Sequence, residues 1–266
     1  RAARISAGGH IRAMQLSARM LRAGHVVREY HLDAELLHEF RQSGSQYPAY
    51  GSIVAGGANA CVLHYRADTA LIQNGDLVLI DAGCELDGYA SDITRTFPAN
   101  GTFNPQQKAI YELVLKAQDA AIDAVQPGAP WDAPHNASVR VITQGLIKLG
   151  LIEGTLAKAI KAEAYRDFYM HRVGHWIGID VHDVGDYKID EKWRLLEPGM
   201  VTTIEPGIYI APDNKRVPKK WRGIGVRIED DVLVTKNGNR VLTTGIPKTV
   251  AEIETFMAQA KQKRAA

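Results

Sequence analysis

The sequence predicts a mixed α/β (α+β) protein made of two similar halves. Three observations support this prediction: apolar residues at helical spacing, short apolar runs bounded by turn residues, and an internal repeat. The chain has 266 residues, of which 45% are hydrophobic and 23% are charged. Such a composition is ordinary for a globular protein, and a chain of this length can bury a sizeable core.

The first quarter of the chain changes from helical to extended patterns. Leucines and methionines recur at helical spacing among charged residues over 4–42, which predicts helices there. Residues 44–60 are rich in Gly, Ser, Pro and Ala, which favours extended chain and turns. An Asn-Gly turn signal then precedes the apolar run 77–80, so we predict a buried strand that ends at Asp81. Residues 89–97 form a second strand candidate.

Two helices are predicted in the middle of the chain. Residues 105–125 carry apolar side chains at amphipathic spacing, with Asn104-Pro105 as a start signal and Pro127-Gly128 as a stop signal. A further helix is predicted over about 133–149, ended by Gly150.

The second half of the chain repeats the order of the first. Residues 75–83 (GDLVLIDAG) align with residues 199–207 (GMVTTIEPG) at a constant offset of 124 residues. Each block holds a turn glycine, a strand, a carboxylate and a second glycine. Each half then offers another acid on a strand-like run, Asp92 and Glu229. We therefore expect two similar α/β halves that meet where their strand ends bring acids together.

Carboxylates within apolar strands need a partner, since burying an unpaired charge costs several kcal/mol. They could be solvated singly, or paired with arginines such as Arg95 and Arg227. One or two divalent cations would compensate such a cluster better. An oxygen-rich site leans to manganese, cobalt or ferrous iron, and bridging carboxylates can hold two ions that activate one water for hydrolysis. The acids concerned are Asp81, Asp92, Glu205 and Glu229.

Three histidines lie within residues 171–183 (HRVGHWIGIDVHD), namely His171, His175 and His182. Two glycines break the segment and it lacks the glutamate of an H-E-x-x-H helix, so the histidines need not share one face. His175 is the ligand candidate, and the other two could donate protons to a developing oxyanion. His64, just upstream of the first acid-bearing strand, is a fourth candidate. A structural role is the alternative for each of them.

Composition argues against some partners. The net charge of +2 gives no reason to expect nucleic acid or an anionic membrane, and no apolar run approaches the roughly 20 residues of a membrane helix. Two cysteines, Cys61 and Cys84, give no disulfide framework and fit a reducing compartment. We expect a cytoplasmic protein. No secretory leader is visible, and a start at Arg1 rather than Met indicates a fragment or a processed chain.

Five motifs in chain order carry a family resemblance: LIDAG with Asp81, YASDITRTF with Asp92, HRVGHWIGIDVHD with His175, TIEPGIY with Glu205 and GVRIEDD with Glu229. They resemble the five-ligand signature of the pita-bread metallopeptidases, which include methionine aminopeptidase, prolidase and aminopeptidase P. The resemblance covers about residues 51–242. Within the family, this sequence is most similar to the bacterial type of aminopeptidase P.

This resemblance implies a pita-bread fold, in which two pseudo-symmetric halves share a curved, mostly antiparallel sheet backed by helices. Residues 1–266 would form this single catalytic domain, with halves of roughly 1–127 and 128–266. The usual N-terminal domain of the family would be absent from this chain. The full-length protein would be a homo-oligomer.

The resemblance also implies roles for individual residues. Asp81 would hold one metal ion, His175 and Glu205 the other, and Asp92 and Glu229 would bridge both. The ions would most often be Mn²⁺, with Co²⁺, Fe²⁺ or Zn²⁺ as alternatives. Glu205 would also handle the proton of the attacking water. The remaining implied catalytic residues are His64, His171 and His182, and the implied substrate contacts are His64, His182, Tyr209 and Arg227.

The implied activity is removal of an N-terminal residue that precedes proline. Prolidase, which cleaves Xaa-Pro dipeptides, shares nearly all these motifs and is the alternative. Methionine aminopeptidase fits the motifs less well, and a non-catalytic binding protein or a creatinase-like enzyme would lack the metal ligands that this chain keeps. One departure concerns Arg172, since relatives tend to carry glycine directly after the first histidine. An added cation at the pocket rim could change substrate preference.

Overall fold

The computed structural model describes residues 1–260. Each helix that the sequence predicts is present close to its predicted position. Asn104 begins α3 as expected, because its side-chain oxygen accepts hydrogen bonds from the backbone N–H groups of Gln106 and Gln107. The helices are α1 (Ala2–Arg22), α2 (Glu29–Gln42), α3 (Pro105–Asp123), α4 (Ala133–Lys148), α5 (Leu156–Lys161) and α6 (Val250–Ala258), with short 3₁₀ helices η1 (Gly57–Cys61), η2 (Ala164–Asp167) and η3 (Lys219–Trp221).

The strands form two three-stranded sheets of order β3-β5-β7 and β10-β13-β14, four further two-stranded pairs being β1-β4, β2-β6, β8-β9 and β11-β12. Every strand pair among residues 1–260 is antiparallel, which confirms the expected mostly antiparallel arrangement. The strands are β1 (Val27–Arg28), β2 (Tyr47–Pro48), β3 (Ile53–Gly56), β4 (Leu71–Ile72), β5 (Leu77–Asp81), β6 (Cys84–Glu85), β7 (Thr94–Pro98), β8 (Lys188–Ile189), β9 (Lys192–Trp193), β10 (Val201–Ile204), β11 (Gly207–Ile210), β12 (Ile224–Arg227), β13 (Asp230–Thr235) and β14 (Gly238–Val241).

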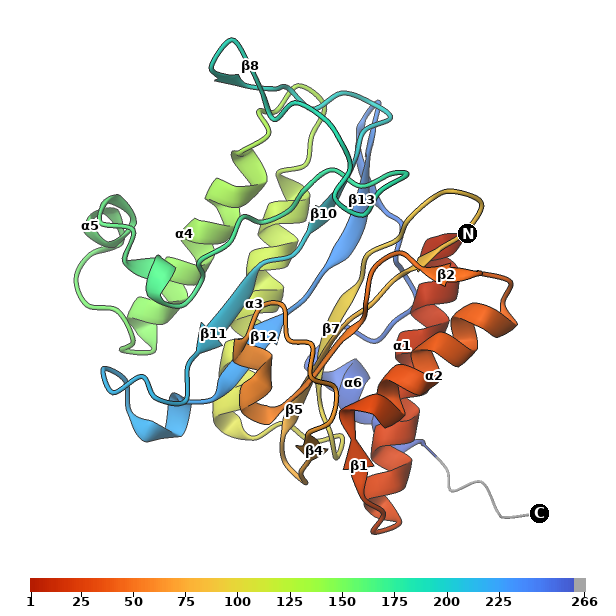
Figure 1. Cartoon of the computed structure of the whole chain (residues 1–266). Coiled ribbons are helices and arrows are strands. Elements are labelled where there is room, and N and C mark those ends of the chain that lie inside the picture. Colours follow the sequence, from red (N-terminus) through yellow and green to blue (C-terminus); the bar gives the residue numbers. More distant parts are fainter. Residues whose placement is uncertain (261–266) are drawn as a thin grey trace.

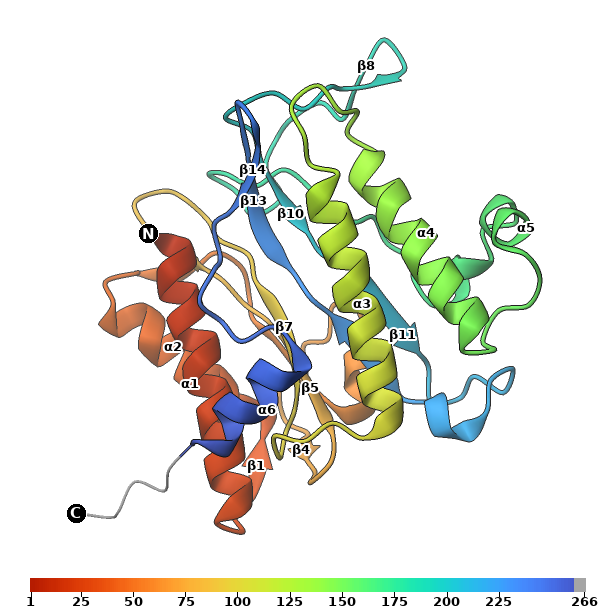
Figure 2. The ribbon, with the colours of Figure 1, turned by 180° about the vertical axis from the view of Figure 1, so that it is seen from behind.

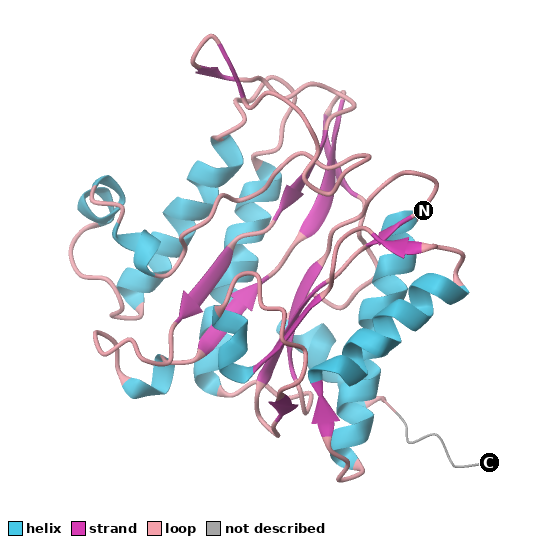
Figure 3. Ribbon diagram, viewed as in Figure 1, coloured by secondary structure: helices cyan, strands magenta, loops and turns pink. Residues whose placement is uncertain are grey.

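Helices back the strands on one face. Figure 1 shows the strands running through the middle of the molecule, with α1 and α2 along one side. Seen from behind in Figure 2, α3 and α4 lie across the strands of the second half. Loops cross the opposite face (Figure 3). In the part of the chain described, no helix combines the length and apolar character that crossing a bilayer requires.

The aligned blocks of the internal repeat adopt the same local structure. Gly75 and Gly199 have φ values of 94° and 100°, in the left-handed region that favours glycine. In each block a strand starts two residues later, β5 in the first and β10 in the second. The repeat seen in the sequence therefore corresponds to a repeated turn and strand.

Strands from the two predicted halves meet along β7 and β12. The Thr96 hydroxyl donates to the carbonyl oxygen of Arg227 at 2.9 Å, and the Glu229 N–H donates to the carbonyl oxygen of Thr94 at 3.0 Å. Beside these bonds, Arg95 Nη2 lies 2.7 Å from Asp230 Oδ1 in an ion pair that is almost completely buried. These contacts fix the backbone that carries the acid-bearing strand ends.

The second predicted strand, 89–97, is wrong at its start, because β7 begins at Thr94. The residues before it make their hydrogen bonds elsewhere: the Ala90 N–H donates to the carbonyl oxygen of Gly178, and the Ser91 N–H donates to that of Cys84. The Ala90–Gly178 bond joins residues 88 positions apart, so the local alternation of side chains could not reveal it.

His10 on α1 predicts an acid-sensitive contribution to stability. The residue is fully buried, and its Nε2 lies 3.0 Å from the carbonyl oxygen of Ala82. Burial lowers the pKa of His10 to about 4. The unfolded chain binds a proton here below about pH 6.5, whereas the folded chain does so only below about pH 4. This stability is therefore complete above pH 6.5 and is lost as the pH falls toward 4.

We expect His10→Gln, which keeps a donor for the Ala82 carbonyl, to remove this pH dependence. Between pH 7 and pH 5 the wild type should lose about 2 kcal/mol more unfolding free energy than the variant. Urea unfolding of the metal-free proteins at both pH values measures the difference. Equal losses in the two proteins would contradict a buried neutral His10.

Candidate metal centre

The predicted acids and histidines line one cavity of about 320 Å³. All five predicted metal ligands contribute to it, as do three predicted catalytic histidines and Arg227. Tyr209 is buried and lies outside the cavity wall, where its hydroxyl contacts His171 and Arg227. The lining residues are Leu63, His64, Asp81, Asp92, His171, Arg172, Gly174, His175, His182, Tyr187, Glu205, Arg227 and Glu229.

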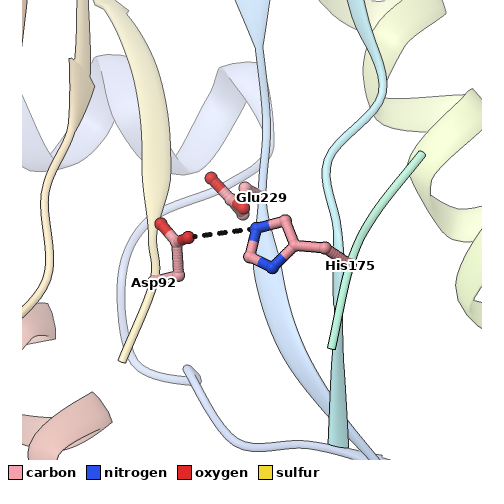
Figure 4. A group of neighbouring side chains, drawn as sticks. All are labelled: Asp92, His175 and Glu229. Carbon is pink, nitrogen blue, oxygen red and sulfur yellow. Dashed lines mark ion pairs between the residues drawn. The ribbon is translucent and has the colours of Figure 1, made fainter. Parts of the chain in front are cut away.

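Three of these side chains converge closely enough to hold a metal ion. One ligand atom each from Asp92, His175 and Glu229 lie within 4.8 Å of one another. Figure 4 shows the three side chains pointing toward a common point from separate segments. Asp92 lies two residues before β7, Glu229 lies between β12 and β13, and His175 comes from the loop before β8. The sequence therefore brings residues 137 positions apart into one cluster.

The His175 ring is oriented by the backbone. Its Nδ1 lies 2.9 Å from the carbonyl oxygen of Trp176, so donation of the Nδ1 proton there leaves Nε2 for the acids. Nε2 lies 3.5 Å from Asp92 Oδ2 and 3.6 Å from Glu205 Oε1. Burial would lower the pKa of His175, but the Asp92 contact and the Glu205 charge outweigh it and raise the pKa to about 9.

Gly174 explains why the histidine segment is interrupted by glycine. A Cβ on this residue would lie 1.9 Å from the carbonyl oxygen of Thr203, which leaves no room for a side chain. The close approach lets the His175 N–H donate to the Thr203 hydroxyl at 3.1 Å and lets the Thr203 N–H donate to the His175 carbonyl at 3.0 Å. The loop is thus held directly against β10, next to Glu205.

Tyr50 is a site residue that the sequence did not identify. Its hydroxyl lies 2.7 Å from Asp81 Oδ1 and also contacts Asp92 Oδ1, so one donor serves two carboxylates. Burial, together with the neighbouring negative charges, raises the pKa of Tyr50 well above its usual value and keeps the hydroxyl protonated. Tyr50 lies in the stretch 44–60, whose composition indicated only turns and extended chain.

Acids outnumber cations around the cavity. Arg227 Nη2 lies 2.7 Å from Asp81 Oδ2, whereas Arg95 pairs with Asp230 outside the cavity. Of the two arginines considered as partners from sequence, one therefore neutralises a single cavity acid. Burial is the main cause that raises the pKa of Asp81, Glu205 and Glu229, that of Glu205 to about 7.

Asp231 adds another acid to this cluster. It is buried, its Oδ2 accepts the Asp92 N–H at 3.2 Å, and its Oδ1 has no partner within residues 1–260. Burial, with the Asp92 charge, raises the pKa of Asp231 well above its usual value. Carboxylates that are this crowded and this poorly compensated, with one imidazole among them, fit a hard divalent cation.

The other cavity histidines lie around the acids. Both ring nitrogens of His171 are engaged within the protein, Nδ1 2.7 Å from the Arg172 carbonyl oxygen and Nε2 2.9 Å from the Tyr209 hydroxyl. Burial lowers the pKa of His171 to about 3, so the ring is neutral at ordinary pH. The His182 ring lies 4.1 Å from the His175 ring, and burial followed by the His175 charge lowers its pKa.

His64 reaches the cavity on a loop that Glu29 organises. The buried Glu29 carboxylate, at the start of α2, accepts four hydrogen bonds from this one loop. All four measure 2.9 Å, and the donors are the Gly56 N–H, the Asn59 side-chain amide, the Tyr65 hydroxyl and the Ala70 N–H. One buried carboxylate therefore fixes both ends of the segment that carries His64.

A larger groove of about 850 Å³ lies beside the N-terminus of α1 and the end of β14. Of the acids and histidines described above, its lining contains only Asp231. Because the five motif residues and the other histidines described above line the smaller cavity, we assign the chemistry to that cavity.

Comparison with known proteins identifies the relatives of this chain. Residues 1–236 match the sequence pattern of metallopeptidase family M24. The Xaa-Pro aminopeptidase of Haemophilus influenzae is 52% identical over 256 residues, which cover 96% of this chain and 58% of that protein. The Xaa-Pro aminopeptidase of Escherichia coli is 47% identical over 263 residues, which cover 99% of this chain and 58% of that protein.

Solved structures agree with these matches. The Pseudomonas aeruginosa aminopeptidase PepP has a TM-score of 0.95 and 64% identity, covering 98% of this chain and 58% of that one. Escherichia coli aminopeptidase P with the inhibitor Pro-Leu has a TM-score of 0.92 and 47% identity, covering 97% of this chain and 57% of that one. The predicted pita-bread fold is confirmed. The chain spans 58% of the length of the two curated relatives.

Proposed function

Because this chain belongs to metallopeptidase family M24, we propose that it is the catalytic part of an Xaa-Pro aminopeptidase. It would release the N-terminal residue from peptides that carry proline in second position. The observation that carries this proposal is the cavity in which all five motif residues meet, three of them within 4.8 Å of one another. The relatives named above are aminopeptidases, which favours this activity over that of a prolidase.

Asp92, His175 and Glu229 would hold a metal ion, and Asp81 and Glu205 would complete a site for a second. We favour Mn²⁺, with Co²⁺, Fe²⁺ or Zn²⁺ as alternatives, because the donors are four carboxylates and one imidazole. Bound divalent ions supply an activated water and polarise the carbonyl group of the bond to be cleaved.

The protein's own groups would move the proton and orient the peptide. Glu205 would take up and return the proton of the attacking water, since its carboxylate lines the cavity beside His175. His64 and His182 line the cavity and would contact the peptide. Tyr209 and Arg227 would act together with His171, since the Tyr209 hydroxyl accepts from Arg227 Nη1 at 3.0 Å and contacts His171 Nε2.

Further parts of the proposal concern the whole protein. We propose that the two halves, roughly 1–127 and 128–266, form one catalytic domain, as the internal repeat suggests. We also propose a homo-oligomer for the full-length protein. A cytoplasmic location is supported by Cys61 and Cys84, which are both free thiols.

Metal removal and substrate length together test the function. We expect this chain with Mn²⁺ to release alanine from Ala-Pro-Ala and to act poorly on the dipeptide Ala-Pro. Chelation should lower the rate on the order of a hundredfold or more, and added Mn²⁺ should restore it. Release of alanine is measured directly. A strong preference for the dipeptide would favour prolidase instead, and cleavage of neither peptide would contradict both.

A further inference from the structure

Two cations contact one indole ring beside the cavity. Arg172 Cζ lies 5.1 Å from the centroid of the Trp193 ring, and Lys188 Nζ lies 4.7 Å from the same centroid. Arg172 lines the cavity and directly follows His171. Lys188 and Trp193 belong to the hairpin of β8 and β9, which projects from the body of the molecule in Figure 1. The ring thus gathers positive charge from two separate segments.

Neither cation forms an ion pair with an acid in the described part of the chain. Within residues 1–260, no carboxylate lies within 4.0 Å of Arg172 or Lys188. The acids nearest to Lys188 in sequence are Asp186 and Asp190, followed by Glu191. Asp190 and Glu191 occupy the turn of the hairpin, where both have positive φ. Both cations are exposed to solvent. A pair of like charges held beside one ring without an acid is suited to binding an external anion.

A short peptide offers an anion in the right place. Its ammonium and carboxylate ends carry opposite charges, and the proposed function brings its N-terminal residues to the acid-lined floor of the cavity. An extended chain advances only about 3.3–3.6 Å per residue. The C-terminal carboxylate of a tripeptide therefore lies only two residues along the chain from the N-terminal residue that the acids hold. A cavity of about 320 Å³ encloses only a short peptide, and Arg172 belongs to its wall.

We propose that Arg172 and Lys188, held at Trp193, bind the C-terminal carboxylate of short peptide substrates. The guanidinium N–H groups and the ammonium would donate hydrogen bonds to the carboxylate oxygens. This inference rests on the proposed aminopeptidase function and adds a substrate class to it, namely short peptides with a free carboxyl end. Arg172, the residue that departs from the family motif, would then determine the preference for a free carboxyl end.

The contact is remote from the bond that is cleaved, so it should stabilise substrate and transition state equally. Its effect should therefore appear in KM rather than in kcat. For exposed cations, we expect a KM for Ala-Pro-Ala about five- to tenfold below that for the tripeptide amide. The preference should shrink at 0.5 M salt, because the charges are exposed.

The test compares acid and amide ligands in two variants. In Arg172→Gln/Lys188→Gln, the ratio of KM values for amide and acid should fall to about one. Lys192→Gln is the matched control, because Lys192 lies on the same hairpin without contacting the Trp193 ring, and it should keep the wild-type ratio. Calorimetric binding of Pro-Leu and Pro-leucinamide gives a second readout that does not depend on turnover.

The possible outcomes are distinct. An acid preference in the wild type that persists in the double variant would overturn the inference, as would equal KM values for acid and amide in the wild type. In both cases cleavage of the amide would still support the aminopeptidase function. If the wild type cleaves neither tripeptide, the proposed function fails instead. Should the double variant unfold, Trp193→Ala supplies the same comparison, since it removes the ring that holds both cations.

Discussion

Replacing Glu205 with glutamine is expected to leave a folded protein whose turnover falls on the order of a thousandfold or more. Glu205 follows β10, with its Oε1 3.6 Å from His175 Nε2. Glutamine keeps the shape of the side chain but has neither the negative charge of a ligand nor a group that takes up a proton. The proposed ligand and proton acceptor are therefore lost together.

The fold should tolerate this change, because the substitution removes one charge from a crowded group of acids. The raised pKa of Glu205, about 7, already reflects the cost of burying that charge. Turnover of Ala-Pro-Ala is measured with Mn²⁺ present, alongside metal content and circular dichroism. The matched control is Glu197→Gln, an exposed glutamate just before β10 that should keep wild-type turnover. A folded, metal-loaded Glu205→Gln protein with near-normal turnover would rule out the role assigned to Glu205.

Three of the four acids could be predicted from sequence because each ends, follows or separates apolar strands, whereas Asp92 lies in the loop before β7. Asp81 ends β5, Glu205 follows β10, and Glu229 separates β12 from β13. A buried charge in such a position requires compensation however the strands pack, so the local sequence pattern was sufficient to identify these acids. Helices α1 to α4 were predicted for a similar reason, since their apolar spacing and caps are local features, whereas α5 and α6 were not predicted.

Other features of the site depend on contacts between distant segments. Tyr50 joins the acids only because the chain before β3 folds over Asp81, and nothing in its neighbourhood marks it. Asp231 could have been found, since alternate residues of a strand share a face. By that rule Glu229 and Asp231 face one side, and Asp230, which pairs with Arg95, faces the other. Arg95 and Arg227 were both considered from sequence as partners for the acids, and the pairing of Arg227 with Asp81 is a tertiary outcome.

The remaining large effect concerns stability. Without metal, Glu229→Gln should be more stable than the wild type, and with metal the wild type should be the more stable protein. Glu229 is 1% exposed, and burial, reinforced by the Asp92 charge, raises its pKa well above the usual value. Since the folded pKa exceeds the unfolded one, the ionised carboxylate destabilises the metal-free fold increasingly as the pH rises above the unfolded value. The Thr94 hydroxyl donates a hydrogen bond to Glu229 Oε2. The neutral amide of glutamine can still accept this bond, and it carries no buried charge.

At pH 8 with chelator, we therefore expect Glu229→Gln to be more stable than the wild type, measured by urea unfolding. With Mn²⁺ at a hundred times its dissociation constant, the wild type should gain about 2.7 kcal/mol, and the variant should gain much less because a ligand is lost. The wild type would then be the more stable protein. Glu197→Gln, which lies outside the cavity lining, should gain as much as the wild type. A variant that is less stable than the wild type in chelator would show that Glu229 carries no burial penalty. A variant that gains as much stability from Mn²⁺ as the wild type would show that Glu229 does not bind the ion. Because the same buried charge causes both effects, the reversal distinguishes a metal ligand from a structural acid, whose removal would destabilise the protein under both conditions.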